Sequence, residues 1–125
     1  MTLDVTSKAK EPGVLMVCPV GSIDTNTHKI LDDHISAAIA RETPSAIVFD
    51  MEGVNYISSM GVRVLLRTRK VLKQTGGKVL MTNLRPQIKM VFDIIKALPS
   101  ERIFTSLQEL DDYLAHMQRR AMEEK

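Results

Sequence analysis

The sequence has little of what several classes of protein need. Its 125 residues include one cysteine, Cys18, no tryptophan and only 4% aromatic residues. A single cysteine excludes an internal disulfide or a thiolate metal cluster, and it is typical of a reducing compartment. The scarcity of aromatics disfavours the stacking platforms that bind single-stranded nucleic acid. No apolar run approaches the roughly 20 residues of a membrane-spanning helix, so membrane insertion is not expected.

Charge is nearly balanced, with 17 Lys and Arg against 15 Asp and Glu, a net charge of +2. This is too weak to indicate nucleic acid or an anionic membrane as the main partner. The first 13 residues lack the apolar core of a secretory signal, so we expect a cytoplasmic protein. The histidines (His28, His34 and His116) have no metal-binding spacing, and we predict neither a metal nor a cofactor.

Hydrophobic periodicity predicts strands that alternate with helices. The expected strands are residues 3–9, 14–20, 46–49 and 78–82, with a short edge strand at Ile103-Phe104. The expected helices are residues 27–42, 58–75, a segment starting at Pro86, and a last helix from a capping box at Ser106 to about Arg120. Residues 51–57 read as a loop. The order predicts an α/β fold, a mixed sheet of four to five strands with about four helices packed on it.

The most informative stretch is a buried strand, a short loop, the pair Ser58-Ser59 and then a helix. Unpaired backbone N–H groups and the positive end of the helix dipole would face this pair and could hold a phosphoryl group on either hydroxyl. The alternative is that one serine is simply the helix N-cap. Asp24 and Asp50 each follow a strand, and each reads equally as a turn residue or as a site residue.

The faces of the helix after Ser59 also differ in chemistry. Its predicted inward face is Gly61, Val64, Leu65, Thr68, Val71 and Leu72, and Arg63, Arg67 and Lys70 form a solvated face. Val62 and Leu66 are expected on the flank between these faces, beside Arg69 and Lys73. Apolar side chains bordered by cations suit a partner's acidic-rimmed groove, although a partly covered edge of the core would look the same.

Residues 56–66, Tyr-Ile-Ser-Ser-Met-Gly-Val-Arg-Val-Leu-Leu, resemble the signature of the STAS domain of bacterial anti-sigma factor antagonists. Three further matches fall in the family's order: Gly-Ser-Ile-Asp at 21–24, the strand at 46–50, and Gly76-Gly77 followed by a strand and the helix from Pro86. The resemblance implies one STAS domain over residues 1–125. Its core would span about 10–115, and 116–125 would form the end of the last helix and a frayed tail.

In family members controlled by phosphorylation, a serine kinase that doubles as an anti-sigma factor modifies the first hydroxyl residue of Asp-Ser-Ser/Thr-Gly. With Gly61 on the motif glycine, Ser59 falls on the phosphoacceptor and Met60 on the second hydroxyl position. Ser58 replaces the aspartate and is the weaker candidate for modification. The resemblance implies that the Asp24 corner lies beside the serine pair and joins a partner surface. Together with the flank of the helix, this predicts a partner surface made of Asp24, Ser58, Met60, Gly61, Val62, Leu66, Arg69 and Lys73.

The resemblance therefore implies a binding protein rather than an enzyme. Its unphosphorylated form would sequester an anti-sigma factor serine kinase of the ATP-binding histidine-kinase-like fold and so free a sigma factor or an equivalent target. A PP2C-type phosphatase would reset it. The alternative is a non-phosphorylated STAS subunit of a transport or scaffold complex. A hydrolase that uses Ser59 is disfavoured, because the Gly-x-Ser-x-Gly elbow is missing.

Overall fold

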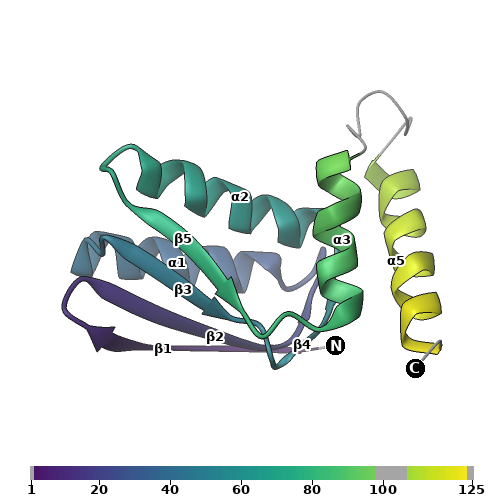
Figure 1. Ribbon diagram of the computed structural model, residues 1–125, viewed down its shortest axis with the longest axis horizontal. Helices are drawn as coiled ribbons and strands as arrows, with labels where there is room; N and C mark the ends of the chain where they lie inside the picture. The colour runs from purple at the N-terminus through teal and green to yellow at the C-terminus, as the bar shows by residue number, and fades with distance from the viewer. Residues whose placement is uncertain (1, 98–106, 124–125) are drawn as a thin grey trace.

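The computed structural model describes residues 2–97 and 107–123 (Figure 1). These residues form five strands and four helices, in keeping with the predicted α/β class. The elements are β1 (Leu3–Glu11), β2 (Val14–Ile23), α1 (His28–Glu42), β3 (Ala46–Asp50), β4 (Val54–Ile57), α2 (Ser59–Lys73), β5 (Lys78–Thr82), α3 (Pro86–Ala97) and α5 (Leu107–Glu123). The predicted edge strand at Ile103-Phe104 and the capping serine Ser106 lie outside the described residues.

The sheet is mixed, as predicted. β1 and β2 are antiparallel, whereas β2, β3 and β5 are parallel neighbours and β4 pairs in parallel with β2. β2 changes partner along its length, from β3 beside residues 14–17 to β4 beside residues 21–23. The N–H of Gly21 donates to Gly53 on the β4 side at 2.9 Å. The backbone nitrogen of Pro19, two residues earlier, is on the same side of β2. It lies between the segments that pair with β3 and with β4, where the lack of an N–H donor costs no hydrogen bond.

The prediction of a loop throughout residues 51–57 was wrong, because Val54–Ile57 forms β4. This strand is only four residues long, and its apolar ends, Val54 and Ile57, are buried while Asn55 between them is exposed. Such a pattern does not alternate, so the sequence lacks the period of a strand. β4 exists because the end of β2 offers it a free edge.

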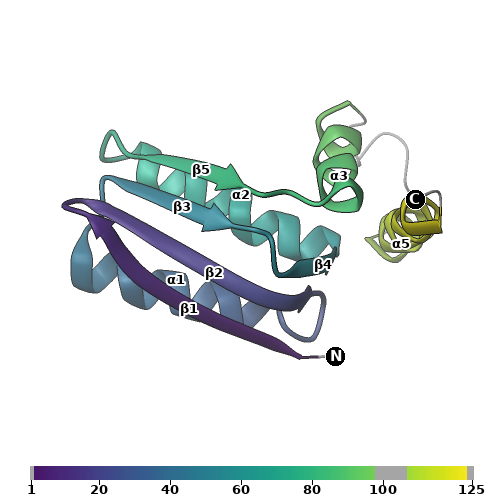
Figure 2. The ribbon, with the colours of Figure 1, turned by 60° about the horizontal axis from the view of Figure 1, so that its bottom comes forward.

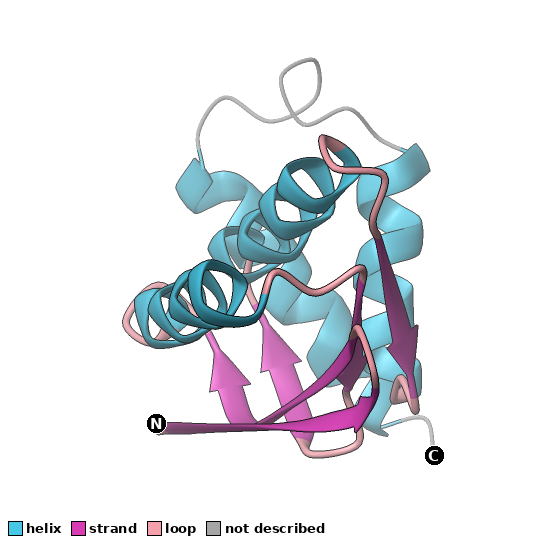
Figure 3. Ribbon diagram, turned by 90° about the vertical axis from the view of Figure 1, so that its left-hand side faces the viewer, coloured by secondary structure: helices cyan, strands magenta, loops and turns pink. Residues whose placement is uncertain are grey.

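The helices occupy two places around the sheet. α1 and α2 cover one face, as Figures 1 and 3 show. α3 and α5 stand side by side beyond the carboxyl ends of β3 and β5 (Figure 2). The core lies between the sheet and the first pair of helices, and it includes Leu15, Val17, Leu31, Ile35, Ile47, Phe49, Leu65 and Leu72. Parallel strands present loops at their carboxyl ends, which places β4, the start of α2, α3 and α5 together at one end of the molecule.

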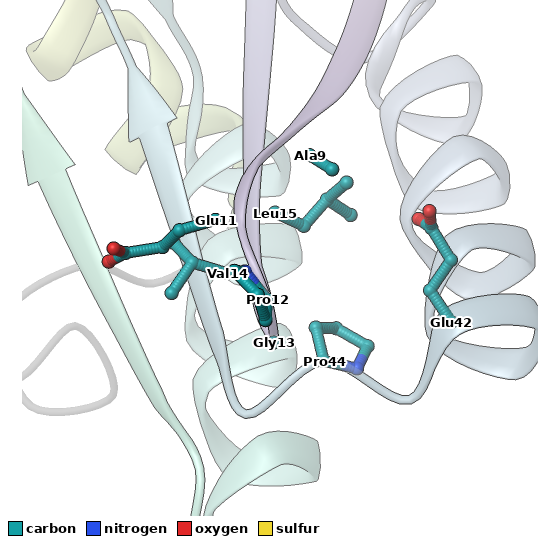
Figure 4. Close-up of a pocket in the computed structure, with 8 residues that line it drawn as sticks. All are labelled: Ala9, Glu11, Pro12, Gly13, Val14, Leu15, Glu42 and Pro44. Carbon is teal, nitrogen blue, oxygen red and sulfur yellow. The ribbon is translucent and has the colours of Figure 1, made fainter.

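The other end of the sheet carries a hollow of about 520 Å³ between the β1–β2 turn and the end of α1. Pro12 and Pro44 are among its lining residues, and its two acids, Glu11 and Glu42, lie on opposite sides of it (Figure 4). Convergent polar groups distinguish a binding pocket from a surface hollow. These two carboxylates do not converge, which leaves the end of the molecule that carries Ser59 as the candidate functional site.

Candidate functional site

Ser58 is the N-cap of α2. Its backbone is extended (φ −94, ψ 175), and its Oγ accepts a hydrogen bond from the N–H of Gly61 at 3.3 Å. Its own N–H donates to the carbonyl of Ile23 at 2.8 Å, which ties the start of α2 to the end of β2. The capping role is therefore confirmed for Ser58, which satisfies one of the donors that a helix start leaves free.

Ser59 is the first residue of α2, and it points at an acid of the C-terminal helix. Its Oγ donates to Asp111 Oδ1 at 2.6 Å, and its backbone N–H donates to the same oxygen at 2.9 Å. Ser59 is only 3% exposed. A carboxylate at this place interacts favourably with the positive end of the α2 dipole and makes strong, charge-assisted hydrogen bonds.

Gln118, two turns further along α5, completes the cover of β4. The N–H of Ile57 donates to Gln118 Oε1 at 3.1 Å, and Gln118 Nε2 donates to the Ile57 carbonyl at 2.8 Å. The side-chain amide thus pairs with the backbone of β4 on the edge that β2 leaves open. Leu114 lies between Asp111 and Gln118 on the same face of α5 and is fully buried.

Asp111 and Gln118 are site residues that the sequence interpretation missed. A signal was present, because both lie on the apolar stripe of the last helix, three and four residues from Leu114. Polar residues on a buried stripe need hydrogen-bond partners. Their partners are 52 and 61 residues away in the chain, however, and only the fold brings them together.

Gly61 is required by close packing. A Cβ on this residue would lie 2.7 Å from a side-chain carbon of Ile23, 2.7 Å from one of Ile57, and 2.9 Å from the Ile23 carbonyl oxygen. All of these distances are shorter than a Cβ tolerates. The motif glycine therefore allows the first turn of α2 to approach β2 and β4 closely, and it fixes the depth at which Ser59 lies.

The two aspartates of uncertain role both form turns. Asp24 Oδ1 accepts from the N–H groups of Asn26 and Thr27 at 2.9 and 3.0 Å, just before α1 begins. Asp50 Oδ1 accepts from the Glu52 N–H and from Asn83 Nδ2, both at 3.1 Å. The Asp24 corner does lie beside the serine pair, as the resemblance implied, because Ile23 pairs with Ile57 of β4.

The flank of α2 lines a groove against β5 and α3. The groove has a volume of about 780 Å³. Its apolar residues are Val62, Leu65, Leu66, Val79, Met81, Phe92 and Ile95, and its cations are Arg69, Lys73, Lys78 and Lys96. Among the described residues that line it, none is acidic. Three of the predicted flank residues, Leu66, Arg69 and Lys73, are exposed along it.

Two of the predicted helix positions were wrong. Val62 is 1% exposed rather than at the boundary, and Val71, expected inward, is 40% exposed. Phe92 and Ile95 of α3 line the same groove as Val62, on this flank of the first turn of α2. Val71 lies at the far end of α2 on its α1 side and lines a shallow hollow there. A helical wheel assumes one buried face throughout, whereas α2 is covered differently at its two ends.

The sequence model of one protein family, the STAS domain, matches residues 6–110 of the chain. The chain belongs to the STAS domain family. It is 31% identical over 85 residues, 68% of this chain and 72% of the relative, to a putative anti-sigma factor antagonist, BtrV, of Bordetella bronchiseptica. The anti-sigma factor antagonist SpoIIAA, solved in its unphosphorylated form, is 20% identical with a TM-score of 0.62, over 73% of this chain and 83% of that one.

A second structural likeness is to a protein of a different description. A sulfate transporter family protein from Wolinella succinogenes is 20% identical with a TM-score of 0.57, over 88% of this chain and 91% of that one. At this identity the likeness concerns the fold alone. No helix within residues 2–97 and 107–123 has the length and apolar character that crossing a membrane requires.

Tyr56 of β4 reports on the charges around this STAS site. Burial raises its pKa above the ordinary 10.0, and nearby Asp111 and Asp24 raise it further, while Arg119 lowers it. The folded state therefore holds the phenol proton more tightly than the unfolded chain does. This contribution to stability is complete below pH 10 and is lost as the pH rises from there through the folded pKa.

We accordingly expect the variant Tyr56→Phe to lose less stability than the natural chain as the solution becomes alkaline. Urea unfolding of both proteins at several pH values between about 9 and 11 measures this difference. The slopes of unfolding free energy against pH should separate above pH 10. Identical slopes would show that the folded protein does not raise the pKa of the Tyr56 phenol.

Proposed function

We propose that this STAS protein is a phosphorylation-controlled, partner-switching antagonist that binds and sequesters an anti-sigma factor serine kinase. The observation that carries the proposal is the position of Ser59. It is the first residue of α2, and it aligns with the phosphoacceptor of the family motif. The 31% identity to a relative named as a putative anti-sigma factor antagonist supports the same role.

The proposed switch depends on charge. A phosphate on Ser59 adds about 1.5 to 2 negative charges and three acceptor oxygens. Within the chain, the start of α2 is a favourable place for an anion. At a closely packed interface, the same group repels acidic side chains and resists loss of its water, so it disfavours docking. In this proposal the unphosphorylated protein holds the kinase and frees a sigma factor or an equivalent target.

The proposed docking surface begins at Met60, next to the buried Ser59, and follows the flank of α2. Leu66 is 46% exposed, next to the groove that β5 and α3 complete, and Arg69 and Lys73 border it. An apolar floor with cations at its rim fits one kind of occupant, a helix that presents leucine-like side chains and carboxylates. Asp24 and Met60 extend the proposed surface, whereas Ser58, Gly61 and Val62 are buried and support it from below.

The proposed partners are a kinase of the ATP-binding histidine-kinase-like fold and a PP2C-type phosphatase that removes the phosphate. Both would act on the protein in the cytoplasm. The protein itself is proposed to work as a binding module and not as an enzyme. The Ser59 hydroxyl donates a hydrogen bond to the Asp111 carboxylate. His28 and His34 make hydrogen bonds elsewhere, to backbone carbonyls before α1 and to the Ser7 hydroxyl.

A second candidate function is that of a non-phosphorylated subunit in a transport or scaffold complex. Two observations favour it. Ser58 replaces the aspartate of the phosphorylation motif, and the hydroxyl of Ser59 is covered by Asp111. In this case the same groove would hold a permanent partner, and no kinase would modify the chain.

Phosphopeptide mapping separates the two functions. The purified protein is incubated with ATP and, one at a time, the serine kinases of the anti-sigma type from the same genome. We expect one phosphate, on Ser59, and none in the variant Ser59→Ala. The control Ser58→Ala keeps the acceptor and removes only the cap, at a cost of about 1 kcal/mol in stability. Phosphate on Ser58 alone, or none with any kinase, would contradict the proposal.

A further inference from the structure

The starting observation is that α5 covers the proposed phosphoacceptor. Ser59 is 3% exposed, and both its hydroxyl and its N–H donate to one oxygen of Asp111. Phosphoryl transfer requires the Ser59 Oγ to approach the γ-phosphorus of ATP closely and in line. With Asp111 in place, the Oγ is both enclosed and committed to a hydrogen bond. A kinase therefore cannot reach it in the conformation that the structure shows.

The attachment of α5 to this corner combines two polar contacts with one buried apolar side chain. Asp111 bonds to Ser59 and Gln118 bonds to Ile57, with the buried Leu114 between them. α5 also packs on α3, beyond the carboxyl ends of the strands (Figure 2). The core cluster is formed mainly by the sheet, α1 and α2, and Leu114 joins it from α5. Local openings of a fold involve such peripheral units, which separate while the central core stays intact.

A phosphate on Ser59 and the carboxylate of Asp111 cannot occupy the same place. In the transfer, the bond from Ser59 Oγ to phosphorus forms, the bond from phosphorus to the bridging oxygen of ATP breaks, and ADP leaves. The hydroxyl proton passes to a base of the kinase. The donor that Asp111 held is then gone, and a phosphate is attached to the Ser59 Oγ, the atom that lay 2.6 Å from Asp111 Oδ1. Like charges at this distance strongly disfavour contact.

We propose that α5 is a latch over Ser59, held closed by Asp111, which must lift before Ser59 is phosphorylated and which the phosphate then keeps open. This inference rests on the proposed function for the identity of the modification. The motif position next to the acceptor holds Ser58 where the family has aspartate, and the carboxylate at this corner comes instead from α5. The chain thus couples its acceptor to its C-terminal helix.

The latch can be tested by hydrogen–deuterium exchange of the full chain, without a kinase. We expect Asp111→Ala to raise the exchange rates of the α5 amides about tenfold or more, because a charge-assisted hydrogen-bond pair is lost. The matched control is Asp112→Ala, which removes the neighbouring, exposed carboxylate, bonded only to Gln108 among the contacts described. Amides of β3 report whether the core stays intact. Equal effects of the two substitutions on α5 would overturn the proposal.

A second pair of variants tests the role of charge. Ser59→Asp stands in for the phosphate and should also release α5, because two carboxylates then meet. Adding Asp111→Asn removes one of these charges and keeps an acceptor oxygen, so the double variant should recover most of the protection. If Ser59→Asp leaves α5 protected, or releases it equally with Asn at position 111, charge repulsion is not the cause and the proposal is wrong. Because no kinase is used, these results stand apart from whether Ser59 is phosphorylated.

Discussion

The variant Leu65→Ala should lower the free energy of unfolding by about 2–5 kcal/mol, the usual cost of truncating a core leucine. Leu65 is 2% exposed and belongs to the cluster between the sheet and the helices. Truncation of its side chain leaves a cavity, because the surrounding residues can move only partly into the space. Urea unfolding of the purified variant measures this loss, and an unchanged slope against denaturant would confirm that the two-state transition is preserved.

The adjacent substitution, Leu66→Ala, is the matched control for stability and the test for binding. Leu66 is 46% exposed, so its truncation should cost less than about 1 kcal/mol in unfolding free energy. If the proposed partner helix lies in the groove, the same change should weaken binding by about 2 kcal/mol, as for an interface anchor. A Leu66→Ala variant that unfolds like Leu65→Ala, or that binds the kinase normally, would show that the partner docks elsewhere.

The second large expected effect is a loss of affinity for the proposed kinase when a charged residue replaces Ser59. Ser59→Asp should weaken the affinity for the proposed kinase by about 2 kcal/mol or more, because a carboxylate is left without a partner at a closed interface. Ser59→Ala adds no charge and should bind as the natural chain does. Calorimetric titration of both variants gives the comparison, and equal affinities would reject a switch based on charge.

The stability of the same two variants depends on Asp111. An acid at the start of a helix ordinarily adds about 0.3–1 kcal/mol. In Ser59→Asp this gain is opposed by the nearby Asp111, so we expect no net stabilisation. Ser59→Ala loses the hydroxyl bond to Asp111 but keeps the N–H bond, and it should lose about 1.5 kcal/mol or more. Thermal melts of both proteins test these expectations.

Elements with a strong local signal were predictable from the sequence. α1 follows its apolar stripe and begins at His28 after the cap Thr27, one residue from the predicted start. β3 is buried along its apolar run, as expected for a central strand. Ser58 caps α2 because its side-chain oxygen accepts a hydrogen bond from an N–H group that the first helical turn leaves free. In each case the physical cause acts within a few residues of the chain.

The remainder of the site depends on distant contacts. β4 forms on an edge of β2, Val62 shares a groove with residues of α3, and Ser59 is covered by Asp111. Each of these facts requires the placement of an element that lies far away in the sequence. The apolar stripe of α5 indicates that one face of this helix is buried. It does not indicate that Gln118 on that face forms hydrogen bonds with Ile57 of β4.

The most direct test of the account compares the affinity of one kinase for two forms of this protein. The kinase that modifies Ser59 is titrated, by calorimetry, with the unmodified chain and with the chain phosphorylated only on Ser59. We predict tight binding of the unmodified chain and an affinity at least about 100-fold lower for the phosphorylated one, a difference of ~2.7 kcal/mol. Equal binding of the two forms would contradict the account.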